Sequence, residues 1–346
     1  MRIAVIGAGA IGLTHCQAIA AVAEAEFAGI ADPFPGGARL AADFGTTAYA
    51  DHRALIAVER PEAAILATPN ETHLPIALDC IAAGVPVLVE KPLVNSLAEA
   101  ETLLAAARAA GLPALVGHHR RHHPWIRRAR DLVASGAIGR LAAVSATAFL
   151  MKPDAYFEPE WRRTPGIGGP FLINLIHEID LIRFVCGEIA EVSALASSAL
   201  RGLAVEDSGA LIFRLEGGAL VSLVLSDCAA GPWSWDMAAG DSPRFPPHDV
   251  NSHLIAGDAG SLTLPRLELW RHDGPRSWTT PMTMERDPAE RLDPYQQQIR
   301  HLMDVVQSGA PSFVSALEGA RNLAVMEAVR TAVESGRTTP VARISG

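Results

Sequence analysis

The chain has 346 residues, a formal net charge of -9 and 49% hydrophobic residues, which is long enough and apolar enough for two globular domains. The acidic balance argues against a nucleic-acid partner, because there is no basic surplus to neutralise phosphates. No stretch approaches the roughly 20 apolar residues of a membrane span, and the first predicted strand starts at residue 2, so we expect no secretory leader. Together with four widely spaced cysteines, these features predict a cytoplasmic protein with free thiols.

The first thirty-two residues predict a dinucleotide-binding unit. A β-branched strand over residues 2–6 runs into the turn Gly7-Ala8-Gly9-Ala10-Ile11-Gly12, and a helix follows over 13–23. The first glycine permits the tight turn, the second lets the backbone approach a pyrophosphate, and the third lets helix and strand pack closely. Unpaired N–H groups at the start of a helix attract phosphate. A second strand, over 26–31, ends at Asp32, whose carboxylate can accept hydrogen bonds from ribose hydroxyls.

Asp32 also favours NAD over NADP as the cofactor. A 2′-phosphate would meet its carboxylate with like-charge repulsion. The residues that follow are Pro33, Phe34 and Pro35 rather than arginine or lysine. An arginine from elsewhere in the fold could reverse this preference.

Apolar strands and helices alternate as far as residue 121. Three more predicted strands end in polar segments, which are Thr68-Pro69-Asn70-Glu71-Thr72-His73, Glu90-Lys91-Pro92 and Gly117-His118-His119-Arg120-Arg121. This alternation predicts a doubly wound parallel sheet. Because ligands of such sheets bind beyond the carboxyl ends of the strands, we expect these segments and the glycine turn to rim one crevice.

After about residue 141 the pattern changes to alternating, half-buried strands. They are predicted over 141–149, 189–196, 208–215, 219–226 and 261–264. The segments 231–249 and 271–293 read as irregular loops, and two helices are predicted over 295–307 and 315–335. The sequence therefore predicts an α/β Rossmann domain over 1–121, followed over 122–346 by an α+β substrate-binding and oligomerisation domain. Its sheet should be open and mostly antiparallel, with helices on one face.

Two segments carry candidate proton-transfer groups. Lys91 follows an apolar strand and precedes a proline, where its ammonium could stabilise a developing alkoxide, although most lysines are simply surface residues. Glu90 could hold this lysine or contact the nicotinamide ribose. A predicted helix over 168–184 contains Asn174 and His177 three residues apart, hence on one face. Histidine has a suitable pKa for a general base near neutrality, but a buried core histidine is the competing interpretation.

The remaining polar candidates are histidines and arginines. Four histidines at 118, 119, 122 and 123 could suggest a metal, but no cysteine or carboxylate cluster joins them, so we expect no metal. Contacts of some of these side chains with cofactor or substrate are the preferred interpretation. Trp161, Arg162 and Arg163 could stack on and hydrogen-bond a polyol or a carboxylate, or form an ordinary surface loop.

These motifs, in this order, resemble the Gfo/Idh/MocA family of NAD(P)-dependent oxidoreductases over essentially the whole chain. The resemblance rests on the glycine turn, on 67–73, on Glu90-Lys91-Pro92-Leu93 and on the helix with His177-Glu178-Ile179-Asp180-Leu181. It implies a dehydrogenase that oxidises a secondary alcohol of a sugar or inositol, or reduces the ketone. It implies Lys91 and His177 as the catalytic pair, and a homodimer or homotetramer formed through the open sheet. The cofactor contacts expected are Gly7, Ala8, Gly9, Ala10, Ile11, Gly12, Asp32, Thr68, Pro69, Asn70, His73, Glu90 and Lys91.

The chain departs from the family pattern at the substrate side of the site. Inositol dehydrogenase-like members usually carry an aspartate four residues before the catalytic histidine, where this chain has Ile173. The usual asparagine of another segment is His119 here, with Arg121 at the arginine. The expected substrate contacts are His119, Arg121, Trp161, Arg162, Arg163, Asn174 and His177.

Three functions fit these residues. The first is an NAD-dependent dehydrogenase of a polyhydroxylated ring or sugar acid. The second keeps the fold but takes a cyclic dihydrodiol, because Ile173 makes the pocket less polar. The third is an NAD-binding sensor without turnover, which the missing aspartate favours and the presence of Lys91 and His177 opposes.

Overall fold

The computed structural model describes residues 1–242 and 244–345. These residues form two compact units. Unit 1 contains Met1–His122, Leu292–Leu323 and the residues from Ile344 onward, and unit 2 contains His123–Arg291 and Ala324–Arg343. The sequence assigned everything after residue 121 to a second domain, whereas this division returns Leu292–Leu323 to unit 1. The domain boundary itself stays a prediction.

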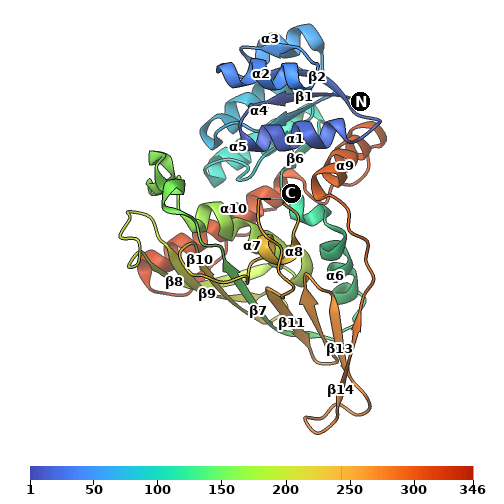
Figure 1. Cartoon of the computed structure of the whole chain (residues 1–346), viewed down its shortest axis with the longest axis vertical. Coiled ribbons are helices and arrows are strands. Elements are labelled where there is room, and N and C mark those ends of the chain that lie inside the picture. Colours follow the sequence, from blue (N-terminus) through green and yellow to red (C-terminus); the bar gives the residue numbers. More distant parts are fainter. Residues whose placement is uncertain (243, 346) are drawn as a thin grey trace. The chain divides into compact units, whose positions relative to one another are not determined.

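Unit 1 is built on a parallel sheet. Among its described residues, six strands pair in the order β3-β2-β1-β4-β5-β6. Figure 1 labels β1, β2 and β6 of this sheet. The strands are β1 (Arg2–Ile6), β2 (Glu26–Ala31), β3 (Ala48–Tyr49), β4 (Ala63–Leu66), β5 (Val87–Val89) and β6 (Ala114–Val116). Strands β4, β5 and β6 are buried along their whole length, as parallel strands covered on both faces must be. The predicted doubly wound sheet is confirmed, and its strand order reverses between β1 and β4, where such sheets bind ligands.

Helices connect these strands and cover the sheet. They are α1 (Ala10–Ala20), α2 (Pro35–Asp43), α3 (His52–Glu59), α4 (His73–Ala82), α5 (Leu97–Ala110) and, from the later part of the chain, α9 (Pro294–Ser308). Their ends follow local chemistry, since Ser96 caps the start of α5 and Gly111 ends it in a left-handed conformation. Helix α9, capped by Asp293, packs on α1 and on the short 3-10 turn η2 (His119–His122).

Unit 2 is built on a large mixed sheet. Among its described residues, nine strands pair in the order β14-β13-β12-β11-β7-β10-β9-β8-β15. Figure 1 labels the central strands β8, β9, β10, β7 and β11. The strands are β7 (Leu141–Phe149), β8 (Ile189–Ser197), β9 (Ser208–Leu215), β10 (Leu220–Ser226), β11 (His253–Gly257), β12 (Ser261–Leu264), β13 (Glu268–His272), β14 (Met282–Arg286) and β15 (Thr339–Pro340). The predicted mostly antiparallel sheet is confirmed, with β7 and β10 paired in parallel.

The helices of unit 2 include α6 (Pro124–Ala134), α7 (Ile176–Cys186), α8 (Trp235–Ala239) and α10 (Ala316–Ser335), whose first part belongs to unit 1. The prediction of irregular loops was wrong in part for two segments. Residues 231–249 contain α8, and residues 271–293 contain β14. Strand β14 is exposed along its length and so lacks the alternation that reveals a strand. The helix predicted over 168–184 begins instead with a π-helical turn, η5 (Phe171–Leu175).

Each unit has its own apolar core. In unit 2 the strands alternate, so that Leu211, Phe213 and Val221 are buried while Ile212 and Val224 point to the opposite, solvent-exposed face. Within the described residues, no helix is long and apolar enough to cross a membrane.

Candidate functional site

The glycine turn of unit 1 has the geometry that each of its glycines was expected to provide. Gly7 adopts φ +104°, and a side chain on Gly7 or Gly12 would collide with backbone atoms of Ala67 or Gly7 respectively. A side chain on Gly9 would meet open space, so this glycine is required by neither packing nor a positive φ. The backbone of Gly9 is therefore accessible, as an approaching pyrophosphate requires.

Asp32 joins this turn to the end of β2. Its carboxylate accepts the backbone N–H of Ala8 at 2.7 Å and that of Phe34 at 2.8 Å. Helix α1 begins at the N-cap Gly9, without a side-chain cap, so its first N–H groups are available to an anion. These observations fit a dinucleotide, with phosphates at the helix start and ribose at Asp32.

Glu90 and His15 form a buried pair next to Lys91. The exposed fraction of His15 is 0% and that of Glu90 is 5%, and His15 Nε2 lies 2.7 Å from Glu90 Oε1. The other carboxylate oxygen, Oε2, accepts the backbone N–H of Lys91 at 3.1 Å. Burial acts to raise the pKa of Glu90, but the hydrogen bond from His15 and the nearby charges of His15, Lys91 and His119 outweigh it and hold that pKa below its usual value. Glu90 is therefore an ionised acceptor and His15 the donor.

Sequence reasoning missed His15. Its signal was present, because a histidine three residues after Gly12 lies one helical turn further along α1, on the side that packs on the sheet. The partner is 75 residues away in the chain, and only the fold identifies it.

His73, a predicted cofactor contact, is fully buried and used inside unit 1. Its Nδ1 lies 3.0 Å from the carbonyl oxygen of Pro92, and its Nε2 lies 3.0 Å from that of Thr68. Burial lowers the pKa of this histidine. The ring therefore joins the ends of β4 and β5, which positions the predicted Thr68–Asn70 and Glu90–Lys91 segments. Its direct contact with a cofactor stays a prediction.

Arg121, a predicted substrate contact, is also held within unit 1. Its Nη1 donates to the carbonyl of Phe313 at 2.7 Å, and its Nη2 pairs with Glu318 at 3.0 Å. His119 stacks on Tyr295 with ring centroids 4.4 Å apart. The structure gives Arg121 a structural role, and the substrate role of both side chains remains a prediction.

The four neighbouring histidines have separate environments. His118 accepts a hydrogen bond from Asn322, His122 packs against His301 and Phe313, and His123 pairs with Asp241. In the part of the chain that the structure describes, no group of three potential metal ligands comes together.

In unit 2, Asn174 lies in the π turn η5, immediately before the helix that carries His177. Asn174 Oδ1 accepts a hydrogen bond from Lys152 Nζ at 2.8 Å. Lys152 Nζ also lies 3.8 Å from Asp227 Oδ2. Lys152 was not among the predicted site residues. His177, the second residue of α7, is 9% exposed, and the next residue, Glu178, pairs with His253 at 2.9 Å.

The predicted Trp161–Arg163 segment is the 3-10 turn η4 (Glu160–Arg163). Arg162 Nη1 donates to the carbonyl of Tyr156 at 2.7 Å, and its guanidinium lies 4.1 Å from the centre of the Tyr156 ring. Trp161 is 48% exposed, and Arg163 is also exposed. The same guanidinium also lies 5.1 Å from the centre of the Trp161 ring, so Arg162 contacts two aromatic rings in addition to its hydrogen bond.

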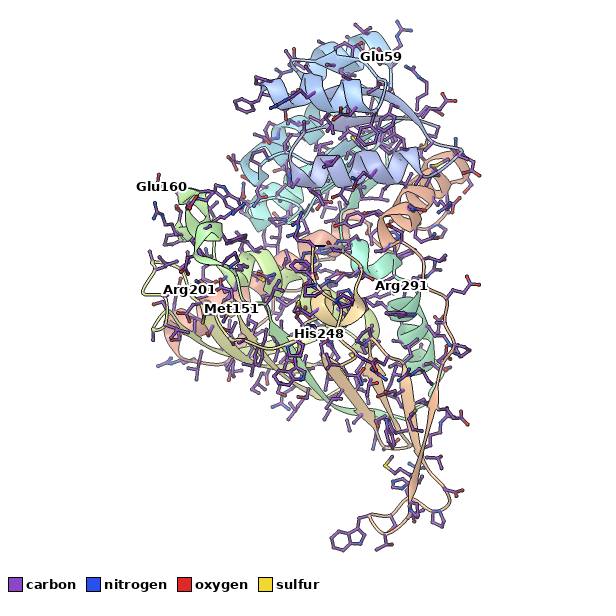
Figure 2. All side chains as sticks on the ribbon, in the orientation of Figure 1. Glu59, Met151, Glu160, Arg201, His248 and Arg291 are labelled. Atoms are coloured by element: carbon purple, nitrogen blue, oxygen red, sulfur yellow. The ribbon has the colours of Figure 1, made fainter. Side chains whose placement is uncertain are left out.

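Behind this region, Arg201 connects Lys152 and Asp227. Its Nη2 donates to the carbonyl oxygens of both residues, and its Nε donates to the Asp227 carboxylate at 3.0 Å. Figure 2 labels Arg201 and Met151, the residue before Lys152. Burial raises the pKa of Asp227, against the opposing effect of the two cations.

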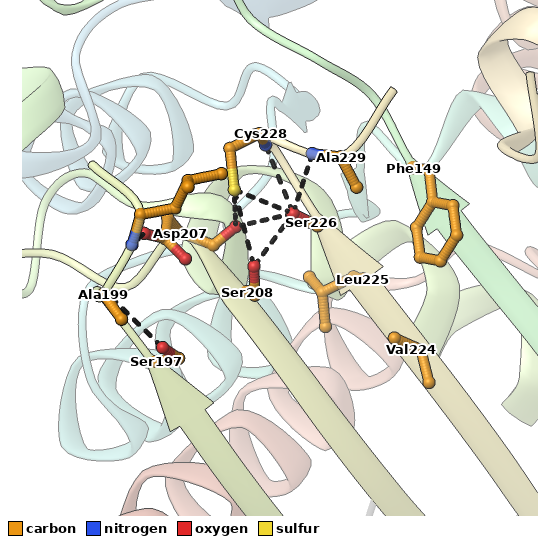
Figure 3. Close-up of a pocket in the computed structure, with 11 residues that line it drawn as sticks. Phe149, Ser197, Ala199, Asp207, Ser208, Val224, Leu225, Ser226, Cys228 and Ala229 are labelled. Atoms are coloured by element: carbon orange, nitrogen blue, oxygen red, sulfur yellow. Dashed lines mark hydrogen bonds between the residues drawn. The ribbon is translucent and has the colours of Figure 1, made fainter. Parts of the chain in front are cut away.

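A pocket of about 430 Å³ lies at the ends of β8, β9 and β10 (Figure 3). Phe149, Leu200 and Val224 supply apolar lining. Its hydroxyl groups bond within the protein: Ser226 Oγ accepts the backbone N–H groups of Cys228 and Ala229 and lies 2.9 Å from Ser208 Oγ. None of the predicted site residues is among the described residues that line it.

Comparison with known proteins matches both parts of the chain. Residues 1–118 match the family model described as an oxidoreductase family with an NAD-binding Rossmann fold. Residues 126–263 match the model described as the GFO/IDH/MocA C-terminal domain. A protein named inositol 2-dehydrogenase 2, from Saccharopolyspora erythraea, is 28% identical over 352 residues, which cover 99% of this chain and 95% of that protein.

Solved structures share the fold at low identity. Levoglucosan dehydrogenase, in complex with NADH and levoglucosan, has a TM-score of 0.84 at 21% identity and covers 99% of this chain and 100% of that one. An oxidoreductase from Agrobacterium radiobacter, in complex with NAD+, L-tartaric acid and magnesium, has a TM-score of 0.81 at 22% identity, with 98% of each chain covered.

Proposed function

Since the chain belongs to the GFO/IDH/MocA family of NAD(P)-dependent oxidoreductases, we propose that it transfers a hydride between NAD and a secondary alcohol or ketone of a sugar, inositol or sugar acid. The observation that carries the cofactor half of this proposal is the Asp32 carboxylate bonded to Ala8 beside an uncapped helix start. The relative named inositol 2-dehydrogenase 2 and the structure with levoglucosan support the substrate half.

The preference for NAD rests on Asp32. Its two carboxylate oxygens already accept backbone N–H groups, and they keep lone pairs for ribose hydroxyls, whereas a 2′-phosphate there would be repelled. The residues that would hold the cofactor are the glycine turn, Asp32 and the polar segments after β4 and β5.

Bound NAD+ would supply the hydride acceptor, so the protein must take up the hydroxyl proton. We assign proton uptake to His177 and stabilisation of the developing alkoxide to Lys91, the two residues of the proposed catalytic pair. The backbone of Lys91 is fixed by Glu90, and its ammonium would stabilise negative charge on the substrate oxygen. His177 would act as a base in its neutral form near pH 7.

The test is cofactor reduction, followed by absorbance at 340 nm, over inositols, aldoses, sugar acids and cyclic dihydrodiols, each with NAD and with NADP. Turnover of a sugar, inositol or sugar acid with NAD is the expected result. Turnover of dihydrodiols alone would mean that the substrate is a cyclic dihydrodiol and not a sugar, inositol or sugar acid. NADH that binds without turnover of any substrate in either direction would favour a sensor.

We also propose that the chain forms homodimers or homotetramers through the exposed face of the unit 2 sheet. Five large apolar side chains of that sheet are between 43% and 72% exposed: Leu195, Ile212, Leu220 and Val224 on the adjacent strands β8, β9 and β10, and Leu254 on β11. Light scattering coupled to size exclusion should give a dimer or tetramer, and Ile212→Asp should dissociate it. A wild-type monomer would refute this part.

A further inference from the structure

Lysine is almost absent from this chain. Lysine and arginine together number 29, and only two of them, Lys91 and Lys152, are lysines. Arginine therefore supplies nearly all of the positive surface charge, while Lys152 is only 8% exposed. A buried ammonium needs compensating partners to offset its desolvation. Because Lys152 is buried, it contributes little to the surface charge, and its role follows from the groups that it contacts.

The contacts of Lys152 fix the orientation of a neighbouring amide. Lys152 Nζ lies 2.8 Å from Asn174 Oδ1, and an ammonium group can only donate hydrogen bonds. The Asn174 side chain must therefore turn its oxygen to Lys152 and its NH2 group away from it. Among the described residues, Asn174 Nδ2 makes no hydrogen bond. In the segment before His177, Asn174 thus presents its NH2 group, which is a hydrogen-bond donor.

A second cation lies on the same aromatic ring as Lys152. Lys152 Nζ is 4.8 Å from the centre of the Tyr156 ring, and the Arg162 guanidinium is 4.1 Å from it. The Lys152 ammonium, the Arg162 guanidinium and the Asn174 NH2 group together make this segment rich in hydrogen-bond donors. Such an environment favours an acceptor oxygen with negative charge.

The nearby carboxylates have partners of their own. Asp227 accepts a charged hydrogen bond from Arg201 at 3.0 Å, closer than the 3.8 Å that separates it from Lys152. Asp207 accepts the backbone N–H groups of Leu200 and Arg201, and Glu206 accepts that of Phe171. Asp154 is fully exposed and pairs with Arg201. Asp227 thus shares its charge between Lys152 and Arg201, the latter through a hydrogen bond.

We propose that Lys152 and the Asn174 amide form a carboxylate subsite, and that the substrate of this enzyme is therefore a hydroxy acid of the sugar-acid class. Lys152 acts as a specificity-determining residue, through its charge and through its hold on Asn174. This inference rests on the proposed dehydrogenase function and names the substrate class within it.

The scarcity of lysine allows a direct binding test. Protein labelled with [6-13C]lysine gives only two lysine side-chain signals, which Lys91→Arg assigns. The full chain, saturated with NAD, is titrated with matched pairs that differ in one carboxylate: glucuronate and glucose, galacturonate and galactose, gluconate and glucitol. We expect an acid to shift the Lys152 signal and its neutral partner to leave it unchanged. Acids that leave Lys152 unmoved throughout the panel would overturn the subsite.

Steady-state kinetics test the same subsite by function. Lys152→Gln should lower kcat/KM for the preferred acid by about 10- to 100-fold, since a charged hydrogen bond is lost, and should change that for the neutral partner less than twofold. Lys152→Arg should recover part of the loss. Arg140→Gln, the same charge change at an exposed site of unit 2, is the control. Equal losses on acid and neutral substrates would refute the specificity role.

The two tests separate this inference from the proposed function. A Lys152 shift without turnover would retain the carboxylate subsite and reject the dehydrogenase. Turnover of neutral sugars with an unmoved Lys152 signal would retain the dehydrogenase and reject the subsite.

Discussion

His15 Nε2 donates to Glu90 Oε1 at 2.7 Å, and this one buried carboxylate also holds the backbone of Lys91 through its other oxygen. The bond ties α1, which begins at the glycine turn, to the Glu-Lys-Pro segment after β5. Two parts of the predicted cofactor site are therefore connected through this side-chain pair. Glu90 was a predicted cofactor contact, whereas His15 was not a predicted site residue.

Replacing Glu90 by Gln should destabilise the protein in a pH-dependent way. The pKa of Glu90 in the folded protein lies below its ordinary value of 4.5, so the ionised carboxylate stabilises the fold above that pH, and the contribution is lost as pH falls through the folded pKa. At pH 7 we expect a loss of about 2 kcal/mol, because the hydrogen bond from His15 to a buried, charged acceptor is replaced by one to a neutral amide. Denaturant unfolding at several pH values between 7 and 3 measures it.

The difference between the wild-type and Glu90→Gln stabilities should begin to shrink as the pH falls below 4.5, the ordinary pKa of the carboxyl group. Glu101→Gln, at an exposed position of α5, removes the same charge and should leave stability unchanged. A stability difference that stays constant from pH 7 to pH 3 would mean that the charge of Glu90 contributes nothing.

Replacing Asp32 by Ala should weaken NAD binding by about tenfold or more, because charged hydrogen bonds to the ribose are lost. NADP binding should change less, since removal of the carboxylate also relieves its repulsion of the 2′-phosphate. Fluorescence titration with NADH and NADPH measures both affinities, with Asp43→Ala on the exposed end of α2 as the control. Equal losses would mean that Asp32 acts only by holding Ala8 and the glycine turn.

Replacing Lys91 by Met should lower kcat by about 10²- to 10³-fold, the range for loss of one group that stabilises charge on the reacting oxygen. NADH affinity should stay within about twofold of wild type if the ammonium acts mainly on the substrate oxygen. The pair of measurements is kcat on the best substrate and NADH titration by fluorescence. A fully active variant would remove Lys91 from the mechanism.

Replacing Ile173 by Asp introduces the carboxylate that inositol dehydrogenase-like members carry. A negative charge near His177 favours the imidazolium and raises the pKa of His177. A base that works in its neutral form then needs a higher pH, so the acid limb of the pH–kcat profile should move upward. Ile173→Asn is the uncharged control. An unchanged profile would mean that residue 173, which lies in the π turn, does not act on His177.

The sequence was sufficient where the determining residues are close in the chain. The glycine turn, its flanking strand and helix, and Asp32 fall within 32 residues, and each has a local steric or electrostatic reason. Strands β7 and β9 were also predicted, because apolar residues alternate with others along their sequences. By contrast, β14 is exposed throughout, and its pairing with β13 has no local signal.

Long-range polar contacts were out of reach of pattern analysis. Lys152 meets Asn174 only because the chain returns to the end of β7, and Arg121 meets Glu318 across 197 residues. An arginine in a histidine-rich segment indicated a substrate contact, whereas burial and two strong acceptors inside unit 1 reveal its structural use. Only the low lysine count could have singled out Lys152 in advance.

The return of Leu292–Leu323 to unit 1 has a consequence for how the protein is made. The first 122 residues contain all six strands of the unit 1 sheet, but not Phe313 and Glu318, the partners of Arg121, or Asn322, the partner of His118. The cofactor-binding unit therefore cannot reach its final packing until nearly the whole of unit 2 has emerged. Vectorial folding, in which an N-terminal domain is finished before the next begins, is not open to this chain, and an excised N-terminal fragment would expose a buried cation.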